Sequence, residues 1–433
     1  MSWSETTIPV ADSTHFETLN GLWVGKKGPF ADAGVIRNTN FTSSGVIDFS
    51  NIAYLQVEKG QLSKRRLEAG DIILERSGGG PKQPVGRVVF FDREAGDFSF
   101  SNFTSVIRVK DKSAFDPRFV FYRLMELYQS GQTEDIQRRT TGIRNLDFTA
   151  YKERARFPKI PLPEQKKIAH VLSTVQRAIE AQERIIQTTT ELKKALMHKL
   201  FTEGFRNEPQ KQTEIGPVPE SWEVVPLGKY ARVLNGYAFK SSDYVRDGVR
   251  LIRISNVSTG FLIDKDDKYL PASYLKERSA YALKAGDLIL SLTRPIIKEG
   301  MKYCLIEEQH LPALLNQRVG RFEITNPRLR KDYLFQIIFS PYFIEPLKYM
   351  AEGSNQPNVS PTRLEAFNIP IPGNMEEQEQ IAKLLTGLNR KMELAQQKAS
   401  QLKDLFRTLL HDLMTAKTRV HEFTLQNCEV TYQ

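Results

Sequence analysis

Cysteine is scarce in this chain of 433 residues, which contains only Cys304 and Cys428. Two cysteines supply neither a disulfide framework nor a zinc cluster, so we expect a reducing, cytoplasmic location. No run of about 18 apolar residues occurs, which argues against a membrane-spanning helix. The first stretch, MSWSETTIPVADSTHFE, has neither a basic start nor an apolar core, so it lacks the pattern of a secretory signal.

The sequence motifs of common enzymes are also missing. The chain contains no His-Glu-x-x-His, Cys-x-x-Cys, Gly-x-Ser-x-Gly or Asn/Asp-Pro-Pro-aromatic run. GLWVGKKG, from Gly21 to Gly28, has one residue too few between its first two glycines, and Lys27 where a phosphate-binding loop needs Ser or Thr. The string from Glu191 to Lys193 resembles a nuclease Glu-x-Lys but lies in a long helical segment. We therefore expect a binding protein with no catalytic residue and no metal site.

Acidic residues are fewer than basic ones, and the formal charge is +10 with a pI near 9.3. Residues 1–159 carry 23 Lys and Arg against 19 Asp and Glu, and residues 216–370 carry 21 against 17, so each region has a net charge of +4. This excess favours a polyanion such as nucleic acid, with a plain solvated basic surface as the alternative. Because the excess is small, we expect weak binding by the chain alone and a need for partners.

An internal repeat is the main feature that the sequence does contain. IPLPEQKKIAHVL begins at Ile160 and IPIPGNMEEQEQIAKLL begins at Ile369, and a shift of 213 positions aligns their Glu-Gln pairs. Further upstream, EAGDIIL at Glu68 matches KAGDLIL at Lys284 at a shift of 216. The order of parts is the same in both halves. The chain is therefore predicted to duplicate a whole unit, made of a mixed region followed by a long helix.

The segment after each Pro-rich stretch has apolar residues at alternating steps of four and three, which predicts a coiled-coil seam. All ten such positions are apolar in the second segment and seven of ten in the first. Pairing within the chain is the economical arrangement, and antiparallel pairing places the two mixed regions at opposite ends of a rod. The 33 positions from 168 to 200 give that rod a length of roughly 50 Å. The seam residues are Ile168, Leu172, Val175, Ile179, Ile186, Leu196 and Leu200 in the first segment and Ile381, Leu385, Leu388, Met392, Leu402, Phe406, Leu409 and Leu413 in the second.

Both mixed regions combine short β-rich runs with helical runs. We expect a strand over 85–91, in VGRVVFF, and helices over 117–131 and 331–350. The predicted fold is α/β (α+β) lobes duplicated in tandem, separated by a long antiparallel two-helix coiled coil, with pseudo-two-fold symmetry. The predicted parts are a first lobe (1–159), a first helical region (160–204), a linker (205–215), a second lobe (216–370), a second helical region (371–420) and a C-terminal tail (421–433).

Basic and amide-rich turns lie at matched places in the two halves. RSGGGPKQPVGR and TRPIIKEGMK follow the AGD strands, while QRRTTGIRN and EGSNQPNVS precede the helices. Glycines let backbone N–H groups approach phosphates, and Arg, Asn and Gln can contact base edges, although each stretch is also a plausible surface turn. The candidate DNA-binding residues are Arg76, Lys82, Gln83, Arg87, Arg138, Arg139, Arg144, Asn145, Arg294, Lys298, Lys302, Asn355, Gln356 and Asn358.

Each of the two variable lobes is followed by a PLPEQ…IA-type entry into a long helix ending near LFTEG, and the passage TEIGPVPESWEVVPLG leads into the second lobe. Together these features resemble the specificity (S) subunit of type I restriction–modification enzymes. The resemblance covers essentially the whole chain. Two departures are the inserted GNM at 373–375 and the missing glycine stop after the second helix, where Lys417 aligns with Gly204.

The resemblance implies that each lobe is a target recognition domain reading one half of a bipartite double-stranded DNA site. It implies that the helices set the spacing and dock two methyltransferase (M) subunits, which use S-adenosylmethionine, and that two restriction (R) subunits add ATP- and Mg-dependent translocation and cleavage. This chain itself would bind no cofactor. Because the lobes differ outside the shared motifs, the half-sites should differ, and the rod matches about one to one and a half duplex turns.

Two other functions remain open at this stage. A DNA-binding adaptor of another modification system without restriction subunits would have the same layout. A purely structural coiled-coil scaffold would show no sequence-selective DNA binding even with partners added.

Overall fold

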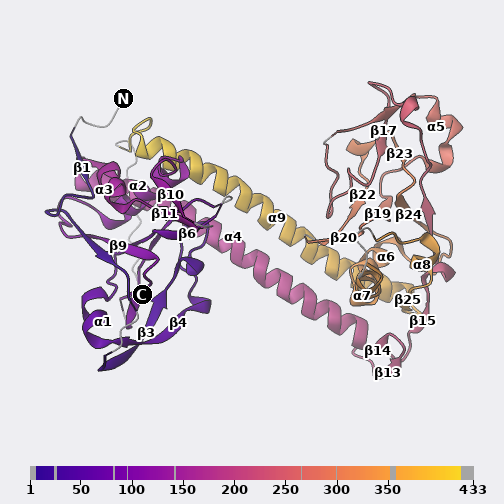
Figure 1. The fold of residues 1–433 in the computed structure, drawn as a ribbon. Coiled ribbons are helices and arrows are strands. Elements are labelled where there is room, and N and C mark those ends of the chain that lie inside the picture. Colours follow the sequence, from indigo (N-terminus) through magenta and orange to yellow (C-terminus); the bar gives the residue numbers. More distant parts are fainter. Residues whose placement is uncertain are drawn as a thin grey trace. The chain divides into compact units, whose positions relative to one another are not determined.

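The computed structural model describes residues 6–23, 27–80, 83–94, 96–140, 143–264, 266–298, 300–351 and 357–420, with the backbone only at 139, 140 and 351. The chain divides into two compact units, the first made of residues 1–184 with 395–433 and the second of residues 185–394. Two long helices, α4 (Leu162–Glu203) and α9 (Met375–Met414), run through both (Figure 1). Among the described helices, none combines the length and apolarity that a membrane crossing requires.

The first lobe is built on a four-stranded antiparallel sheet in the order β2–β9–β5–β7 and a three-stranded sheet in the order β4–β3–β8, in which β3 and β8 are parallel. β1 pairs with β12. The strands are β1 (Thr7–Pro9), β2 (Phe16–Asn20), β3 (Phe30–Ile36), β4 (Ala53–Glu58), β5 (Ile72–Glu75), β7 (Val88–Phe90), β8 (Phe98–Phe100), β9 (Thr104–Val109) and β12 (Arg156–Pro158), and the helices are α1 (Lys59–Arg65), α2 (Pro117–Gln129) and α3 (Phe148–Arg154).

The second lobe repeats this plan strand by strand. Its sheets have the orders β16–β24–β19–β22 and β18–β17–β23, with β17 parallel to β23, and β15 pairs with β25. The strands are β15 (Glu223–Pro226), β16 (Ala231–Asn235), β17 (Val249–Ile252), β18 (Tyr269–Leu270), β19 (Leu288–Ser291), β22 (Tyr303–Leu305), β23 (Ala313–Leu315), β24 (Val319–Ile324) and β25 (Asn368–Ile371), and the helices are α5 (Tyr274–Glu277), α6 (Lys331–Ile338), α7 (Pro341–Ala351) and α8 (Pro361–Glu365).

The AGD motif explains why each central strand forms where it does. Asp71 accepts a hydrogen bond from the backbone N–H of Glu68 at 2.8 Å, and Asp287 accepts one from Lys284 at 2.9 Å, which closes a tight turn before β5 and β19. The glycine of each AGD motif, Gly70 in the first lobe and Gly286 in the second, has a positive φ. The strands that follow are apolar on both faces, because successive residues pack into two different cores.

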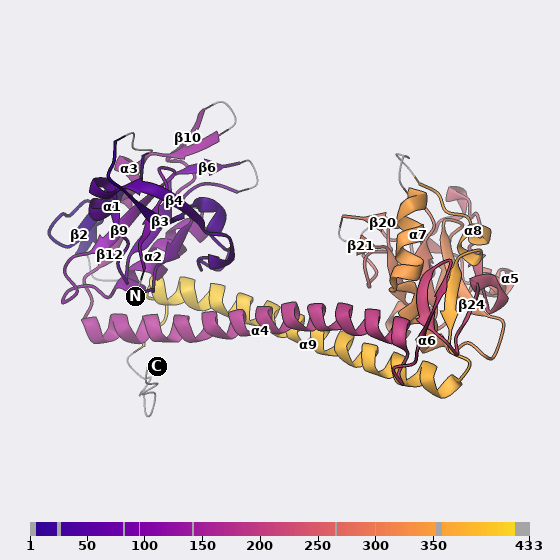
Figure 2. The same cartoon turned by 90° about the horizontal axis from the view of Figure 1, so that it is seen from below.

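Within each unit, α4 and α9 run in opposite directions (Figure 2). In the first unit, Glu183 on α4 pairs with Lys403 on α9 at 2.7 Å, and Glu164 pairs with Arg419 beyond the end of α9 at 3.1 Å. In the second unit, Thr190 contacts Met392 at 3.5 Å. Every seam residue on both helices is buried or half-buried.

The buried glutamine of each Pro-rich stretch joins the helix to its lobe. Gln165 accepts a hydrogen bond from the backbone N–H of Asp116 at 2.9 Å and donates to the carbonyls of Ala114 and Ile160 at 2.7 and 3.0 Å. Its counterpart in the second half, Gln378, forms the same set of bonds with different residues. It accepts from the N–H of Arg330 and donates to the carbonyls of Arg328 and Pro372. The repeated phrase in the sequence is therefore the joint between a lobe and its long helix.

Three local expectations need correction. The helical run expected over 331–350 is divided into α6 and α7, because Pro341 disfavours a helical conformation at Ser340 before it. The expected linker at 205–215 contributes β13 (Gln210–Thr213), which pairs with β14 (Gly216–Pro219) in a hairpin. The strand expected over 85–91 is shortened to β7.

The two long helices end in the same way with different residues. Gly204 follows α4 with a φ of +70°, as its position in the sequence indicates. After α9 the residue with a left-handed backbone is Ala416, with a φ of +60°. The aligned Lys417 is therefore not the position at which the second helix turns.

Candidate nucleic-acid interface

The turns singled out in the sequence come together at one edge of each lobe. In the first lobe, β6 (Ser77–Gly79) pairs with β11 (Ile143–Leu146), which pairs with β10 (Gln137–Thr140). In the second lobe, Thr293 and Asn358 form a β-bridge beside the hairpin of β20 (Ile296–Ile297) and β21 (Gly300–Met301). We call these places the first and the second reading edge. The main sheets of the two lobes match, whereas the strands at the two reading edges differ.

A side-chain hydrogen bond fastens each reading edge to its scaffold. The Ser77 hydroxyl donates to Oδ1 of Asn145 at 2.6 Å, and the Thr293 hydroxyl donates to Oδ1 of Asn358 at 2.6 Å. A backbone hydrogen bond of 2.8 Å is repeated beside each of these bonds. The N–H of Leu146 donates to the carbonyl of Arg76 in the first lobe, and the N–H of Val359 donates to the carbonyl of Leu292 in the second. Asn145 and Asn358 were expected to contact DNA, but their carboxamide oxygens are used to hold the edge.

Two of the candidate arginines are held inside the first lobe. Arg87 binds Glu75 through two contacts of 2.7 and 2.8 Å and also donates to the carbonyls of Phe41 and Asn38. Burial opposes its charge, but the hydrogen bonds and negative charge of Glu75 raise the pKa of Arg87. Arg87 therefore stabilises the lobe, contrary to the expectation that it lies free for DNA.

Arg76 is also turned toward its own lobe. It donates to Oδ1 of Asn20 at 2.8 Å, and its guanidinium lies 4.7 Å from the ring centroid of Phe148. Burial lowers the pKa of Arg76. Its side chain still lines a shallow pocket at the first reading edge together with Arg138 and Asn145.

Other candidates are open to solvent. Arg138 is 78% exposed and forms an ion pair of 2.7 Å with Asp147, and Gln83 is exposed. Arg144 is half-buried, whereas Arg294 and Lys298 are exposed. Lys302 is half-buried and donates to the carbonyl of Ile254 at 2.6 Å. Four candidates lie outside the described residues or side chains, namely Lys82, Arg139, Asn355 and Gln356.

Sequence reasoning missed two residues at matched places on these edges. The carbonyl of Phe103 accepts hydrogen bonds from the backbone N–H groups of Arg76 and Ser77. At the matched place, the carbonyl of Arg318 accepts one from the backbone N–H of Leu292. Phe103 is 46% exposed and Arg318 is also exposed. An exposed aromatic ring can stack on a base and an exposed arginine can bind a base edge or phosphate. A repeat alignment extended through β9 and β24 would have paired these two positions.

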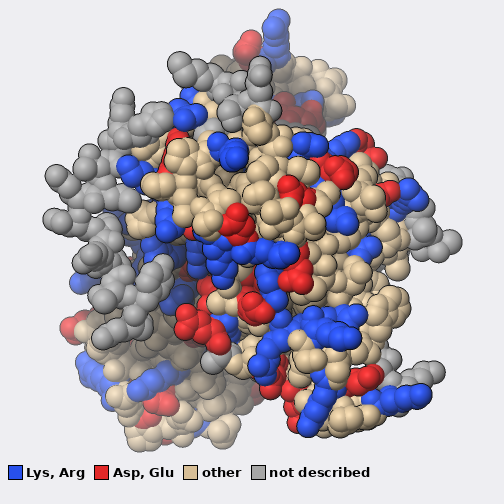
Figure 3. Space-filling model, turned by 90° about the vertical axis from the view of Figure 1, so that its left-hand side faces the viewer, with Lys and Arg blue, Asp and Glu red and all other residues tan. Residues whose placement is uncertain are grey.

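Charge on the first unit is mixed rather than uniform. Seen from the side of the first lobe, Lys and Arg form a broken band across the surface with Asp and Glu between them (Figure 3). Ion pairs account for part of this pattern, since Arg108 alone contacts Asp71 and Glu68 at 2.7 Å. The observed surface agrees with the small net charge of the lobe.

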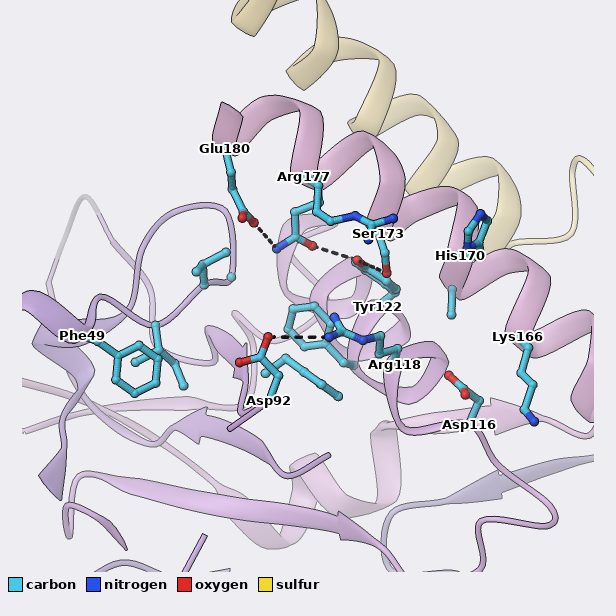
Figure 4. Close-up of a pocket in the computed structure, with 17 residues that line it drawn as sticks. Phe49, Asp92, Asp116, Arg118, Tyr122, Lys166, His170, Ser173, Arg177 and Glu180 are labelled. Carbon is cyan, nitrogen blue, oxygen red and sulfur yellow. Dashed lines mark hydrogen bonds and ion pairs between the residues drawn. The ribbon is translucent and has the colours of Figure 1, made fainter. Parts of the chain in front are cut away.

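A cavity of about 450 Å³ separates the first lobe from α4 (Figure 4). Asp92 and Arg118 face it from the lobe, and His170, Arg177 and Glu180 face it from the helix. At its floor Tyr122 donates to Gln176 at 2.8 Å and lies 3.1 Å from the hydroxyl of Ser173, and burial raises the pKa of Tyr122 to about 12. The lining is polar and apolar in equal parts, and its charges are balanced.

The second unit has a hollow of about 620 Å³ at the matching place, between its lobe and α9. Its lining is mostly apolar. Leu305, Asp332, Phe335 and Thr386 stand where the first unit has Phe90, Arg118, Phe121 and Ser173. The groove between lobe and helix is thus a feature of the repeat, while its chemistry differs between units.

The chain thus contains two lobes of the same fold, whose edges are held by the same kind of bond and carry different residues. The family described as "Type I restriction modification DNA specificity domain" matches residues 18–190 and 219–404, so the chain belongs to that family. The specificity subunit of the MjaVIII type I restriction enzyme from Methanocaldococcus jannaschii is 33% identical over 73% of this chain and 74% of its own length. The putative MjaX specificity subunit from the same organism is 25% identical over 87% and 85%.

A solved structure supports the fold. The S subunit of a type I restriction–modification system from M. genitalium covers 94% of this chain and 95% of its own chain, with a TM-score of 0.62 and 16% identity. The resemblance stated from the sequence is confirmed.

Proposed function

We propose that the chain is the DNA-specificity subunit of a type I restriction–modification complex and that its lobes read the two halves of an asymmetric, bipartite site in double-stranded DNA. The observation that carries this proposal is the pair of reading edges. One scaffold and one fastening bond occur twice, and the residues that each edge presents differ. Two similar heads with different contact residues are suited to two different half-sites.

In this proposal α4 and α9 form an antiparallel coiled coil that acts as the spacer between half-sites and gives the chain pseudo-two-fold symmetry. The support is local to each unit, where the helices run in opposite directions and their apolar seams are covered. The glutamine joints add to it, since each ties a helix to its lobe through three hydrogen bonds to loop backbone groups and to the segment before the helix.

The helices also carry a docking surface for methyltransferase subunits. Leu192 on α4 and Leu405 on α9 are 54% and 47% exposed and are separated by the repeat shift of 213 residues. Exposed leucines at equivalent places suit two copies of one partner. L192E and L405E, made singly, should each remove one methyltransferase copy from the purified complex. A partner bound in full by the double variant contradicts this docking surface.

Catalysis and cofactors belong to the partner subunits in this proposal. S-adenosylmethionine would be bound by the methyltransferase subunits, and ATP with Mg by restriction subunits, with none bound by this chain. Calorimetry with S-adenosylmethionine should show no heat of binding for the isolated chain and clear binding for the complex. A complex that purifies with methyltransferase alone would instead favour the adaptor of a modification system without restriction subunits.

The main test exchanges one lobe. Residues 216–370 are replaced by the corresponding lobe of another family member, and the DNA methylated in cells is sequenced. Only one half of the recognised sequence should change, with the gap retained. A change in both halves, or in the gap alone, contradicts the assignment of one lobe to one half-site.

A further inference from the structure

One backbone position at the reading edges is left-handed in both lobes. It follows the hydroxyl residue of the fastening bond directly, and it is Gly78 in the first lobe and Arg294 in the second, with φ of +110° and +50°. A Cβ at Gly78 would lie 2.4 Å from Nδ2 of Asn38, so the first lobe needs glycine there. Glycine is also the residue that this conformation favours in the second lobe, yet an arginine occupies it.

The strain at Arg294 cannot be relieved by a small movement of its loop. Its N–H donates to the carbonyl of Pro357 at 2.8 Å, and the N–H of Lys302 donates to the carbonyl of Pro295 at 2.7 Å. The preceding residue, Thr293, is held by the fastening bond to Asn358. A residue kept in an unfavourable conformation by a fixed surrounding indicates that its side chain serves another purpose.

The charge around Arg294 gives a second, independent argument. The side chain is exposed, and within the described ranges no acidic side chain pairs with it. Lys302 is close enough to respond, since burial and then the positive charge of Arg294 lower the pKa of Lys302. Two cations that repel each other in the free protein are stabilised when an electronegative group binds between or beside them.

We propose that Arg294 determines specificity in the second half-site by donating two hydrogen bonds to O6 and N7 of one guanine. This inference rests on the proposed DNA-reading function and assigns one contact within it. Bidentate binding of guanine is the commonest specific use of arginine in the major groove, and it needs a guanidinium carried on a rigid backbone. The fastened, left-handed position supplies that rigidity. The first lobe has glycine here, so its half-site is read through other residues.

The experiment uses the complex with its methyltransferase subunits and three variants of this chain. R294G removes the side chain and the strain, R294K keeps the charge without the planar fork, and N207G is the matched control. Asn207 is exposed, lies in the second unit and has a similar φ of +53°. Methylation rates are measured on DNA libraries in which each base pair of the second half-site is varied, and thermal unfolding is measured in parallel.

We expect R294G to raise the melting temperature by about 2–4 °C, as relief of strain in a unit of the size of residues 185–394 should. Discrimination at a single G·C pair should fall roughly 10- to 100-fold in R294G and at least 10-fold in R294K, with the other positions and the first half-site unchanged. N207G should alter stability alone.

Any one of three results overturns the inference. These are retained discrimination at the G·C pair in R294G, a lower melting temperature in R294G, and a loss of methylation rate that is spread evenly over all base-pair positions. An even loss would identify a phosphate contact. The proposed function is tested separately by the wild-type complex, which must show a bipartite site whatever the variants do.

Discussion

Oγ of Ser77 lies 2.6 Å from Oδ1 of Asn145 and donates a hydrogen bond to it, and the chain forms the same bond again between Thr293 and Asn358. Each bond joins a turn after the central strand to the segment before the long helix. The two partners are 68 residues apart in sequence in the first bond and 65 in the second, so each bond fixes a loop whose position local structure cannot determine.

Removing these hydroxyls should loosen one reading edge at a time. S77A and T293V should each cost about 0.5–1.5 kcal/mol of unfolding free energy, since a single partly buried hydrogen bond is lost. Selectivity should fall at the half-site read by the altered lobe and stay intact at the other, as measured by methylation of DNA libraries. T202V is the control, because the Thr202 hydroxyl bonds only to backbone carbonyls in its own helix. Equal loss at both half-sites would show that the bond supports the whole complex.

The buried glutamine joint leads to a second prediction. In Q165L, the N–H of Asp116 and the carbonyl of Ala114 lose their partner, and leaving them unpaired should cost about 1–3 kcal/mol. The angle between lobe and helix should also become less fixed, so the complex should accept a wider range of gaps between half-sites. Q187L is the control, since Gln187 is exposed on the same helix. A destabilised variant with an unchanged gap preference would contradict the joint's role in spacing.

The ion pair of Arg87 and Glu75 allows a third prediction, in which stability and DNA binding respond differently. The Glu75 side chain is 2% exposed and that of Arg87 is 15% exposed, so R87M leaves a buried carboxylate unpaired and should cost about 3–5 kcal/mol. The double variant R87M/E75Q should recover part of that loss in urea unfolding. The salt dependence of DNA binding by folded complex should not change. If the slope of log binding constant against log salt concentration became smaller in magnitude by about one, Arg87 would contact phosphate after all.

Sequence periodicity and the repeat together predicted a mixed lobe followed by a long helix in each half, but they left the order of the strands open. The Leu- and Ile-rich strands after AGD could be recognised because they are buried on both faces, and the long helices because their seams are regular. The inward position of Arg87 could not be recognised from the sequence. The composition of a turn does not show which of its side chains bind a buried carboxylate elsewhere in the lobe. Glutamine is usually exposed, so only the repeat marked Gln165 as unusual.

The hairpin of β13 and β14 was missed for a related reason. Its segment is rich in Pro, Gly and polar residues, which are typical of linkers, and strand pairing depends on partners that composition does not reveal. At the reading edges, residue types identified the right region but not the roles of its members. Asn145 and Asn358 fasten the edge, and the left-handed backbone of Arg294 is visible only in the structure.

The spacer proposal gives the last prediction. The contact of Thr190 with Met392 sets the register of α4 against α9 within the second unit, so residues 188–194 lie opposite approximately 388–394. Deleting both segments removes one heptad from each helix and preserves the seam, because seven residues restore the same face. At 1.5 Å per residue the rod shortens by about 10 Å, which corresponds to about three base pairs.

Sequencing of methylated DNA from cells carrying this double deletion should therefore show the same two half-sites with a gap shorter by about three base pairs. Deleting 188–194 alone is the control, and it should abolish assembly because α4 is then one heptad shorter than α9. Unchanged half-sites at an unchanged gap, in a double deletion that still assembles, would mean that the lobes find their spacing through the partner subunits. The paired helices would then serve docking alone.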